Sequence, residues 1–352
     1  MSFKIFNRLP EKFKRICRSP PVRFQIYFML EKSELKIVSL LPSATEIVCA
    51  LGLENNLVGI THECDFPQSV AGKPPLTASR ISHETMSSAE IDHAVRSNLD
   101  GHGSIYDLDE KRLHELKPDL IITQELCEVC AVSYKTVEKA AKMYVSEATV
   151  VSLEPNTIAD IFANIVTVAE LCGIPETGKS VVKDLQSRLD NIKAQIREYR
   201  ANPKSEIRNP KSVMMLEWLE PPFAPGHWVP EQVEIAGGLP LLGAAGEKSL
   251  TTTYAAIYES QPEILVLIPC GYYIADIVRQ IPQTVFPANW RELPAVVNNN
   301  VWAVDASAYF SRPAPRVVDG AEILAKIFHP EIFGAPHENE AIRVQLNFAG
   351  SD

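Results

Sequence analysis

The feature that most limits the possible folds of this chain is a set of short apolar runs in which polar and apolar residues do not alternate. The first half contains KIVSLL, LVGI, DLIIT and ATVVS, and the second half contains VMMLEW, ILVLI and VWAV. A strand with one face in water alternates, whereas a strand of a parallel sheet is covered on both faces and does not. Amphipathic patterns such as SSAEIDHAVRS lie between the runs and supply those covers. The sequence therefore predicts an α/β fold with parallel sheets.

A stretch without any strand pattern, residues 157–201, separates the two sets of runs. Five apolar residues in it recur at helical spacing between charged residues: Val181, Leu185, Leu189, Ile192 and Ile196. They predict one long helix near residues 178–200. Because 352 residues exceed one ordinary hydrophobic core, we predict two Rossmann-like lobes that this backbone helix joins.

The same patterns give the expected boundaries along the chain. They are a basic, disordered extension at 1–34, an N-terminal α/β lobe at 35–155, connecting helices at 156–201, a linker insertion at 202–212, a C-terminal α/β lobe at 213–333 and a tail at 334–352. The insertion is assigned from NPKSEIRNPKS, in which Asn-Pro-Lys-Ser occurs twice without an apolar period.

Charge is distributed unevenly. Residues 1–33 carry eight Lys and Arg against two Glu, so the net charge of −10 leaves −16 on the remainder of the chain. An acidic body of this kind excludes a nucleic-acid partner. The apolar part of the basic segment, FQIYFML, is too short for an export signal or a membrane span. We therefore expect a cytoplasmic monomer from the residues alone, and seven cysteines without an export signal favour free thiols.

Reactive side chains are concentrated in the segments that directly follow the predicted strands. In open α/β sheets, ligands bind beyond the carboxyl ends of the strands. The candidate ligand-binding residues in these segments are Pro42, Ser43, Ala44, Thr45, His62, Glu63, Cys64, Cys127, Cys130, Phe223, His227, Trp228, Cys270, Tyr272, Tyr309 and Phe310. Tyr273 adjoins this set. If the helix between the lobes holds the two edges face to face, these segments line one cleft.

Ser43 has a second interpretation as the start of a helix. The sequence from Ser43 to Glu46 fits the capping-box pattern, in which the serine caps a backbone amide and the glutamate bonds back to the serine amide. Gly52 is expected to end that helix. Ligand contact by Ser43 is then secondary to its structural role.

Cys127 and Cys130 form the one C-x-x-C pair of the chain. A redox couple, half of a metal site, a disulfide and two residues that line a ligand cleft are all compatible with such a pair. No thioredoxin-sized arrangement surrounds it, so we favour contact with a ligand or a structural role over redox catalysis. A zinc site would need further ligands from His62, Cys64, His227 or Cys270, which requires both lobes to converge.

His227 is the most specific candidate for ligand contact, because Gly226 and Trp228 flank it and Phe223 lies nearby in the sequence. A neutral imidazole there can act as a metal ligand while the aromatic residues cover apolar surface. The alternative is a histidine that bonds to the backbone of a tight loop.

Four separated segments together resemble a known family. They are VSLLPSATEIVCALGLENNLVGITHECDFP, LDEKRLHELKPDLIITQELCEVCAVS, LEWLEPPFAPGHWVPEQVEIAGG and SAYFSRPAPRVVDGAEILAKIFHPE. This chain, from about residue 35 to 333, is similar to the cobalamin-binding branch of the helical-backbone solute-binding proteins, which serve ABC importers of vitamin B12, haem and iron-siderophores. The resemblance implies two lobes on one helix, a ligand between them and an exported protein. For a corrinoid ligand it also implies that His227 is the candidate axial ligand to cobalt.

The first hypothesis is therefore a binding protein for a corrinoid, which is its ligand and not a catalytic cofactor, with an ABC importer permease as the partner. The alternatives are a haem or iron-siderophore binding protein of the same fold and, from a different class, a cytoplasmic metal or thiol enzyme that uses the Cys and His loops. No nucleophile elbow of the G-x-S-x-G type occurs in the sequence. We accordingly expect a protein that is not an enzyme.

Overall fold

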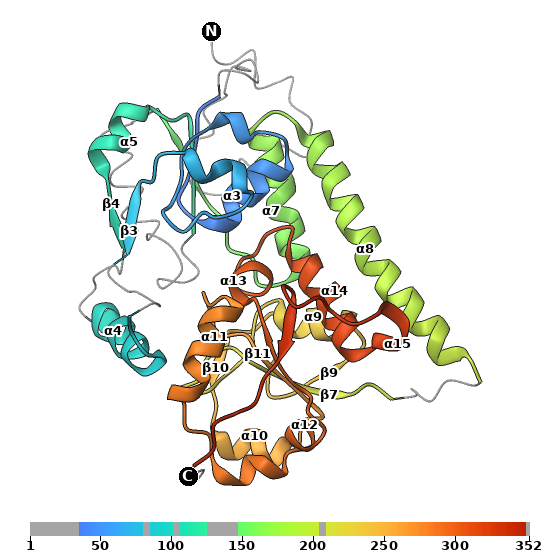
Figure 1. Cartoon of the computed structure of the whole chain (residues 1–352). Coiled ribbons are helices and arrows are strands. Elements are labelled where there is room, and N and C mark those ends of the chain that lie inside the picture. Colours follow the sequence, from blue (N-terminus) through green and yellow to red (C-terminus); the bar gives the residue numbers. More distant parts are fainter. Residues whose placement is uncertain (1–34, 80–84, 101–105, 125–146, 204–208, 350–352) are drawn as a thin grey trace. The chain divides into compact units, whose positions relative to one another are not determined.

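A computed structural model describes residues 35–79, 85–100, 106–124, 147–203 and 209–349 (Figure 1). Cys127, Cys130 and the extension at 1–34 lie outside the described residues. Residues 35–352 form one compact unit. Within its described part, no helix combines the length and the apolar character that a membrane crossing requires.

The first sheet contains four parallel strands in the order β2-β1-β5-β6. Its strands are β1 (Ile37–Ser39), β2 (Leu57–Gly59), β5 (Leu120–Thr123) and β6 (Thr149–Ser152). Every residue of β1 and β5 is buried, which is why these runs are apolar without alternation. The α-helices described in this half are α3 (Pro42–Ala50), α4 (Ser88–Asp100) and α5 (Glu110–Leu116), and a separate antiparallel pair is β3 (Thr77–Ser79) with β4 (Tyr106–Leu108).

The second sheet contains five strands in the order β13-β12-β11-β7-β9, of which β13 alone is antiparallel to its neighbour. Its strands are β7 (Ser212–Leu216), β9 (Leu239–Pro240), β11 (Ile264–Leu267), β12 (Val301–Val304) and β13 (Ala341–Arg343). A short antiparallel pair joins β8 (Phe223–Ala224) and β10 (Leu250–Thr251). The helices are α9 (Val229–Ile235), α10 (Tyr254–Ser260), α11 (Ile274–Gln280), α12 (Pro294–Val297), α13 (Ala306–Tyr309), α14 (Val317–Phe328) and α15 (Pro330–Phe333).

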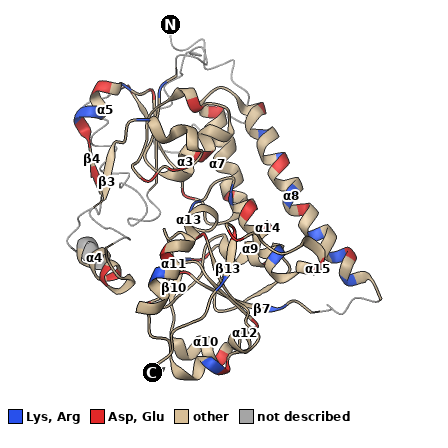
Figure 2. Ribbon diagram, in the orientation of Figure 1, with Lys and Arg blue, Asp and Glu red and all other residues tan. Residues whose placement is uncertain are grey.

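Two helices connect the sheets, α7 (Ile158–Leu171) and α8 (Pro175–Ala201). The helix α8 packs along α7 and also contacts α9, α14 and α15 (Figure 1). Its buried residues include Leu185, Leu189, Ile192 and Ile196, as the helical spacing predicts. Acidic and basic residues occur along the length of α8 (Figure 2). The two sheets on one long helix confirm the predicted fold class.

One apolar cluster extends through both halves of this unit. It includes Ile37 of β1, Ile165 of α7, Leu189 of α8 and Val213 of β7. A second cluster lies on the other face of the second sheet around Trp290 and Phe286, whose rings stack 5.4 Å apart. The continuous cluster fixes the connecting helices against both sheets.

Two details of the sequence interpretation are wrong. The helix α3 begins at Pro42, its N-cap residue is Leu41, and no side chain caps it, so Ser43 and Glu46 form no capping box. Proline suits the first helical turn because it lacks an amide hydrogen and has a helical φ, and the start therefore moves ahead of Ser43. The segment predicted as a tail supplies β13, which pairs with β12. Gly52 ends α3 as expected, with φ of +72°.

Candidate functional site

The carboxyl ends of β1 and β2 bring together one group of predicted residues. The Thr45 hydroxyl donates to Ser39 Oγ at 2.8 Å and lies 3.0 Å from Cys64 Sγ. The whole segment from Pro42 to Thr45 is buried at the start of α3. Through Thr45, these residues contact Cys64 in the 62–65 segment. A direct contact between them and a ligand stays a prediction.

The side chains of His62 and Glu63 are more exposed to solvent than the segment from Pro42 to Thr45. His62 Nδ1 lies 2.7 Å from Thr77 Oγ1, and the Tyr106 hydroxyl donates to Glu63 Oε1 at 2.9 Å. Burial lowers the pKa of His62 from its ordinary value, with a smaller opposing effect from Glu63. His62 is therefore neutral at pH 7, with its ring position fixed through Nδ1.

The loops at the carboxyl edge of the second sheet are bonded to one another. Trp228 Nε1 donates to the Phe310 carbonyl at 3.0 Å, and Gln232 Nε2 donates to the Tyr309 carbonyl at 3.0 Å. The structure thus brings Trp228, Tyr309 and Phe310 together, although Trp228 and Phe310 are themselves buried.

The remaining predicted residues of this edge differ in exposure. Tyr272 is fully buried, with its ring edge-on to Trp218 at 5.5 Å and its hydroxyl 3.3 Å from Ser88 Oγ. Cys270 is exposed, and Phe223 is half-buried in β8. Tyr272 is therefore part of the apolar cluster around Trp290.

His227 occupies a strained position in a tight loop. Its φ is +52°, its amide donates to the Glu247 carbonyl at 2.6 Å, and its carbonyl accepts from the Gly246 amide at 2.9 Å. Its Nδ1 is buried and has no hydrogen-bond partner in the described part of the chain. Burial, with a contribution from Lys248, lowers the pKa of His227. The ring is therefore a neutral imidazole at pH 7.

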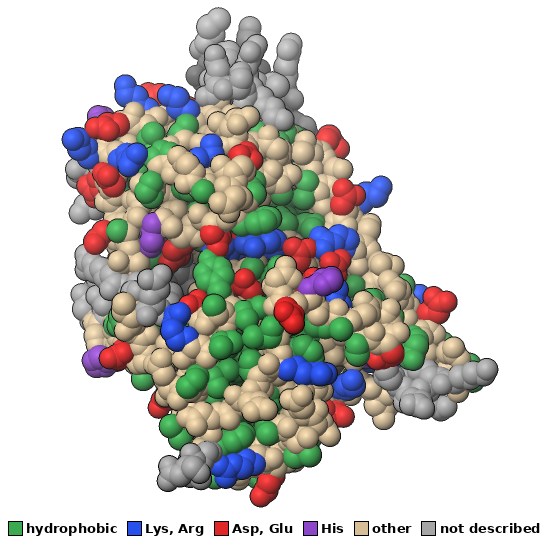
Figure 3. Space-filling model, viewed as in Figure 1, with side chains coloured by type: hydrophobic (Ala, Val, Ile, Leu, Met, Phe, Trp, Pro, Cys, Tyr) green, Lys and Arg blue, Asp and Glu red, His purple; other side chains and the backbone are tan. Residues whose placement is uncertain are grey.

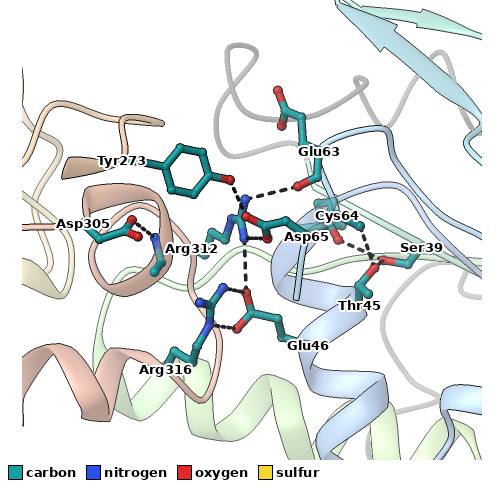
Figure 4. Close-up of polar contacts among 12 residues, drawn as sticks. Ser39, Thr45, Glu46, Glu63, Cys64, Asp65, Tyr273, Asp305, Arg312 and Arg316 are labelled. Carbon is teal, nitrogen blue, oxygen red and sulfur yellow. Dashed lines mark hydrogen bonds and ion pairs between the residues drawn. The ribbon is translucent and has the colours of Figure 1, made fainter. Parts of the chain in front are cut away.

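A network of ion pairs joins the loops of the two sheets (Figure 4). Arg312 pairs with Asp65, and its Nη2 donates to the Glu63 carbonyl at 3.1 Å. Arg316 bonds both carboxylate oxygens of Glu46, at 2.9 and 2.6 Å. On the face shown in Figure 3, basic and acidic side chains lie close together near the middle of the view.

The pKa values of the two carboxylates in this network shift in opposite directions. Burial alone would raise the pKa of Asp65, yet the Arg312 and Arg316 guanidiniums and the Tyr273 hydroxyl hold it below its ordinary value. Burial raises the pKa of Glu46 against the opposing effect of both arginines. Tyr273 donates its hydroxyl to Asp65, and burial together with this carboxylate raises its pKa to about 12.

The sequence interpretation did not include Asp65, Arg312 or Arg316 among the site residues, and it gave Glu46 only a capping role. Both arginines stand in the SRPAPR segment after β12, and Asp65 follows Cys64, so each lies in a segment that follows a strand. Charged residues at such edges were the available signal. Their pairing depends on partners about 250 residues away, which no local pattern reveals.

A small cavity lies beside this network. It has a volume of about 250 Å³ and is lined by residues that include Glu46, Cys49, Phe66 and Arg316. The guanidinium of Arg316 stacks on the exposed Phe66 ring at 4.1 Å. Sites for drug-sized ligands occupy roughly 300–1,000 Å³, so a large macrocycle needs the two sets of loops to separate.

No metal centre is formed by the described residues, because no three His, Cys, Asp or Glu side chains among them gather closely enough. His62, Cys64, His227 and Cys270 thus do not make the zinc site considered from the sequence. Any contribution of Cys127 and Cys130 lies outside the described residues. The chemistry that this edge offers is recognition by neutral imidazoles, aromatic rings and paired charges.

Comparisons with known proteins agree on one type of molecule. A family model described as periplasmic binding protein matches residues 37–308. The vitamin B12-binding protein of Vibrio cholerae is 25% identical over 288 residues, which cover 82% of this chain and 86% of the relative. An uncharacterized ABC transporter substrate-binding lipoprotein of Bacillus subtilis is 23% identical over 309 residues, which cover 86% of this chain and 83% of the relative.

Solved structures show the same fold. The crystal structure of the periplasmic vitamin B12 binding protein of Vibrio cholerae has a TM-score of 0.56 at 22% identity and covers 83% of this chain and 96% of its own. A periplasmic haem binding protein of Pseudomonas aeruginosa has a TM-score of 0.64 at 16% identity, with coverage of 88% and 99%. Both neighbours therefore support the arrangement of two sheets on a connecting helix.

Proposed function

This chain belongs to the family of periplasmic binding proteins, and on that premise we propose that it binds a corrinoid between the loops of its two sheets. Members of this type take vitamin B12, haem or iron-siderophores, so the question is which chemistry this edge accepts. The proposal extends to delivery of the ligand to an ABC importer, in line with the name of the Bacillus subtilis relative.

The observation that carries the proposal is the pairing of both arginines in the network. Arg312 is bound to Asp65, and Arg316 is bound to Glu46. Haem carries propionate carboxylates, and many ferric siderophores are anions, so receptors for them need cations without partners. The arms of a corrin ring end in uncharged amides. A balanced network with hydroxyl and carbonyl groups suits amides better than carboxylates.

His227 supports the same ligand class. A corrinoid offers an axial coordination position on cobalt, and a neutral imidazole is a suitable ligand for it. The Nδ1 atom of His227 lacks a hydrogen-bond partner among the described residues, and the Trp228 ring lies 5.7 Å from the His227 ring. We place His227, Trp228 and Phe223 as the main contact on the second sheet, opposite the 42–45 and 62–64 segments.

A visible-absorption titration with hydroxocobalamin tests the proposal. We expect the purified protein to bind hydroxocobalamin in a one-to-one complex and to bind hemin more weakly. If His227 coordinates cobalt, His227→Ala removes a spectral shift of the bound corrinoid, whereas Phe223→Ala weakens binding and leaves the shift in place. Tight hemin binding without hydroxocobalamin binding would reverse the assignment in favour of haem.

A further inference from the structure

We propose that Asp65 is an internal anion that occupies a binding position on Arg312 and thereby sets the charge of the ligands that the cleft accepts. The inference takes from the proposed function only the place of the ligand, between the loops of the two sheets. It assigns charge selectivity to one side chain.

The surroundings of Asp65 are those of an anion site. Its Oδ1 accepts from the guanidinium of Arg312, and its Oδ2 accepts from the hydroxyl of Tyr273 (Figure 4). Both donors come from loops of the second sheet, whereas Asp65 follows β2 of the first. A cation and a hydroxyl on one half therefore bind a carboxylate that the other half supplies, in the place where a ligand anion would bind.

The two carboxylates of the network differ in how easily they can be replaced. The Glu46 side chain is 2% exposed and is bound through both oxygens by Arg316, which is itself 14% exposed. The Asp65 side chain is 38% exposed, while that of its partner Arg312 is 9% exposed. Asp65 is thus the partner that solvent or a ligand can reach.

Within the described part of the chain, Arg312 has no fully available second carboxylate when Asp65 is neutral. Glu46 Oε1 lies 3.6 Å from Arg312 Nη1, but that carboxylate already neutralises Arg316. Asp305 accepts a hydrogen bond from the Ala308 amide at 2.8 Å and caps α13. Two guanidiniums would then share one carboxylate, and the network would carry a positive charge that attracts an anion.

Two kinds of ligand respond differently to this arrangement. A ligand carboxylate must displace Asp65 from Arg312 and is repelled by it, so the unmodified chain discriminates against haem. An amide competes for neither charge. Removing the negative charge of Asp65 while keeping its shape should therefore strengthen haem binding and leave corrinoid binding unchanged.

The experiment compares the full chain with Asp65→Asn, Asp65→Ser and the double variant Asp65→Asn/Arg312→Gln, using hemin and hydroxocobalamin as probes. Hydrogen bonds to charged groups change affinities by about tenfold or more, so Asp65→Asn should bind hemin at least about tenfold more tightly. Its affinity for hydroxocobalamin should change by less than about threefold. The double variant should lose the gain, because the cation that receives the carboxylate is gone.

Glu110→Gln is the matched control, since it removes one negative charge from an exposed position in α5. It should leave hemin affinity unchanged and so separates a local effect from the overall charge. Thermal unfolding with and without pyrophosphate gives a second readout, in which Asp65→Asn and Asp65→Ser are stabilised and the parent chain is not.

Equal hemin affinity for the parent chain and the two Asp65 variants, without a pyrophosphate effect, overturns the inference. The same holds if the double variant keeps the gain. If the parent chain fails to bind hydroxocobalamin while Asp65→Asn still gains hemin binding, the corrinoid assignment falls and the role of Asp65 stands.

Discussion

Glu46→Gln should destabilise the protein far more than a single hydrogen bond would suggest. The change keeps the shape of the side chain and removes the charge that neutralises Arg316, whose Nε and Nη2 lie 2.9 and 2.6 Å from the carboxylate. Breaking a buried ion pair by removing one partner costs about 3–5 kcal/mol. Arg316 is 14% exposed and keeps its contact with the Phe66 ring, so we expect the lower end, about 3 kcal/mol.

Glu322→Gln provides the matched comparison. Glu322 also binds an arginine through both oxygens, with Arg188 Nε and Nη2 at 2.9 and 2.6 Å. Both partners are about four-tenths exposed, at 39% and 38%. Solvent-exposed ion pairs contribute about 0–1 kcal/mol, so this variant should unfold within about 1 kcal/mol of the parent chain.

Urea unfolding followed by circular dichroism measures both free energies. The unfolding midpoint should move clearly for Glu46→Gln and only slightly for Glu322→Gln, with similar slopes of the transition. If the two variants lose the same small amount of stability, burial does not determine the strength of these pairs, and the account of the network fails.

Three further outcomes are expected. Burial lowers the pKa of His329 from its ordinary value of 6.5, so the unfolded chain binds a proton more readily than the folded one. The free energy of unfolding should therefore fall as pH drops below 6.5, by at most about 1.4 kcal/mol per pH unit for this residue. Urea unfolding at several pH values should show a weaker dependence of this free energy on pH for His329→Gln. A Cβ at Gly226 would lie 2.3 Å from the Ser249 amide nitrogen, so Gly226→Ala should lower the free energy of unfolding by about 2–3 kcal/mol. The change should also weaken hydroxocobalamin binding in a titration. An unchanged melting temperature would contradict the close packing at this position. The double change of Cys127 and Cys130 to Ser should weaken ligand binding without unfolding the protein, and the parent should show no insulin reduction; robust reduction would restore the redox interpretation.

The fold was predictable because burial on both faces leaves a direct trace in the sequence. The apolar runs at β1, β5, β11 and β12 are continuous for that reason. In α8, apolar residues at helical spacing between charged residues mark its buried face. The antiparallel pair of β3 and β4 was missed, since each strand has three residues and α4 lies between them in the sequence.

The site was harder to predict because its contacts are not local. Glu46 matched a capping pattern with a residue three positions away, yet its partner Arg316 is 270 positions away. A helix cap is readable from neighbours, whereas an ion pair between two sheets depends on how the sheets are placed. The sequence could mark the loops after the strands but not the partners within them.

The strand β13 has a consequence for the behaviour of the chain at high concentration. It covers the outer side of β12, where Arg343 stacks over the Trp302 ring at 4.8 Å, and Lys326 binds Glu340 just before it at 2.7 Å. Without this cover, the apolar run Val301–Val304 would present its unpaired amides and carbonyls to other molecules. The strand β13 therefore prevents β12 from pairing with a strand of another molecule. Loss of β13 would favour aggregation of folded molecules.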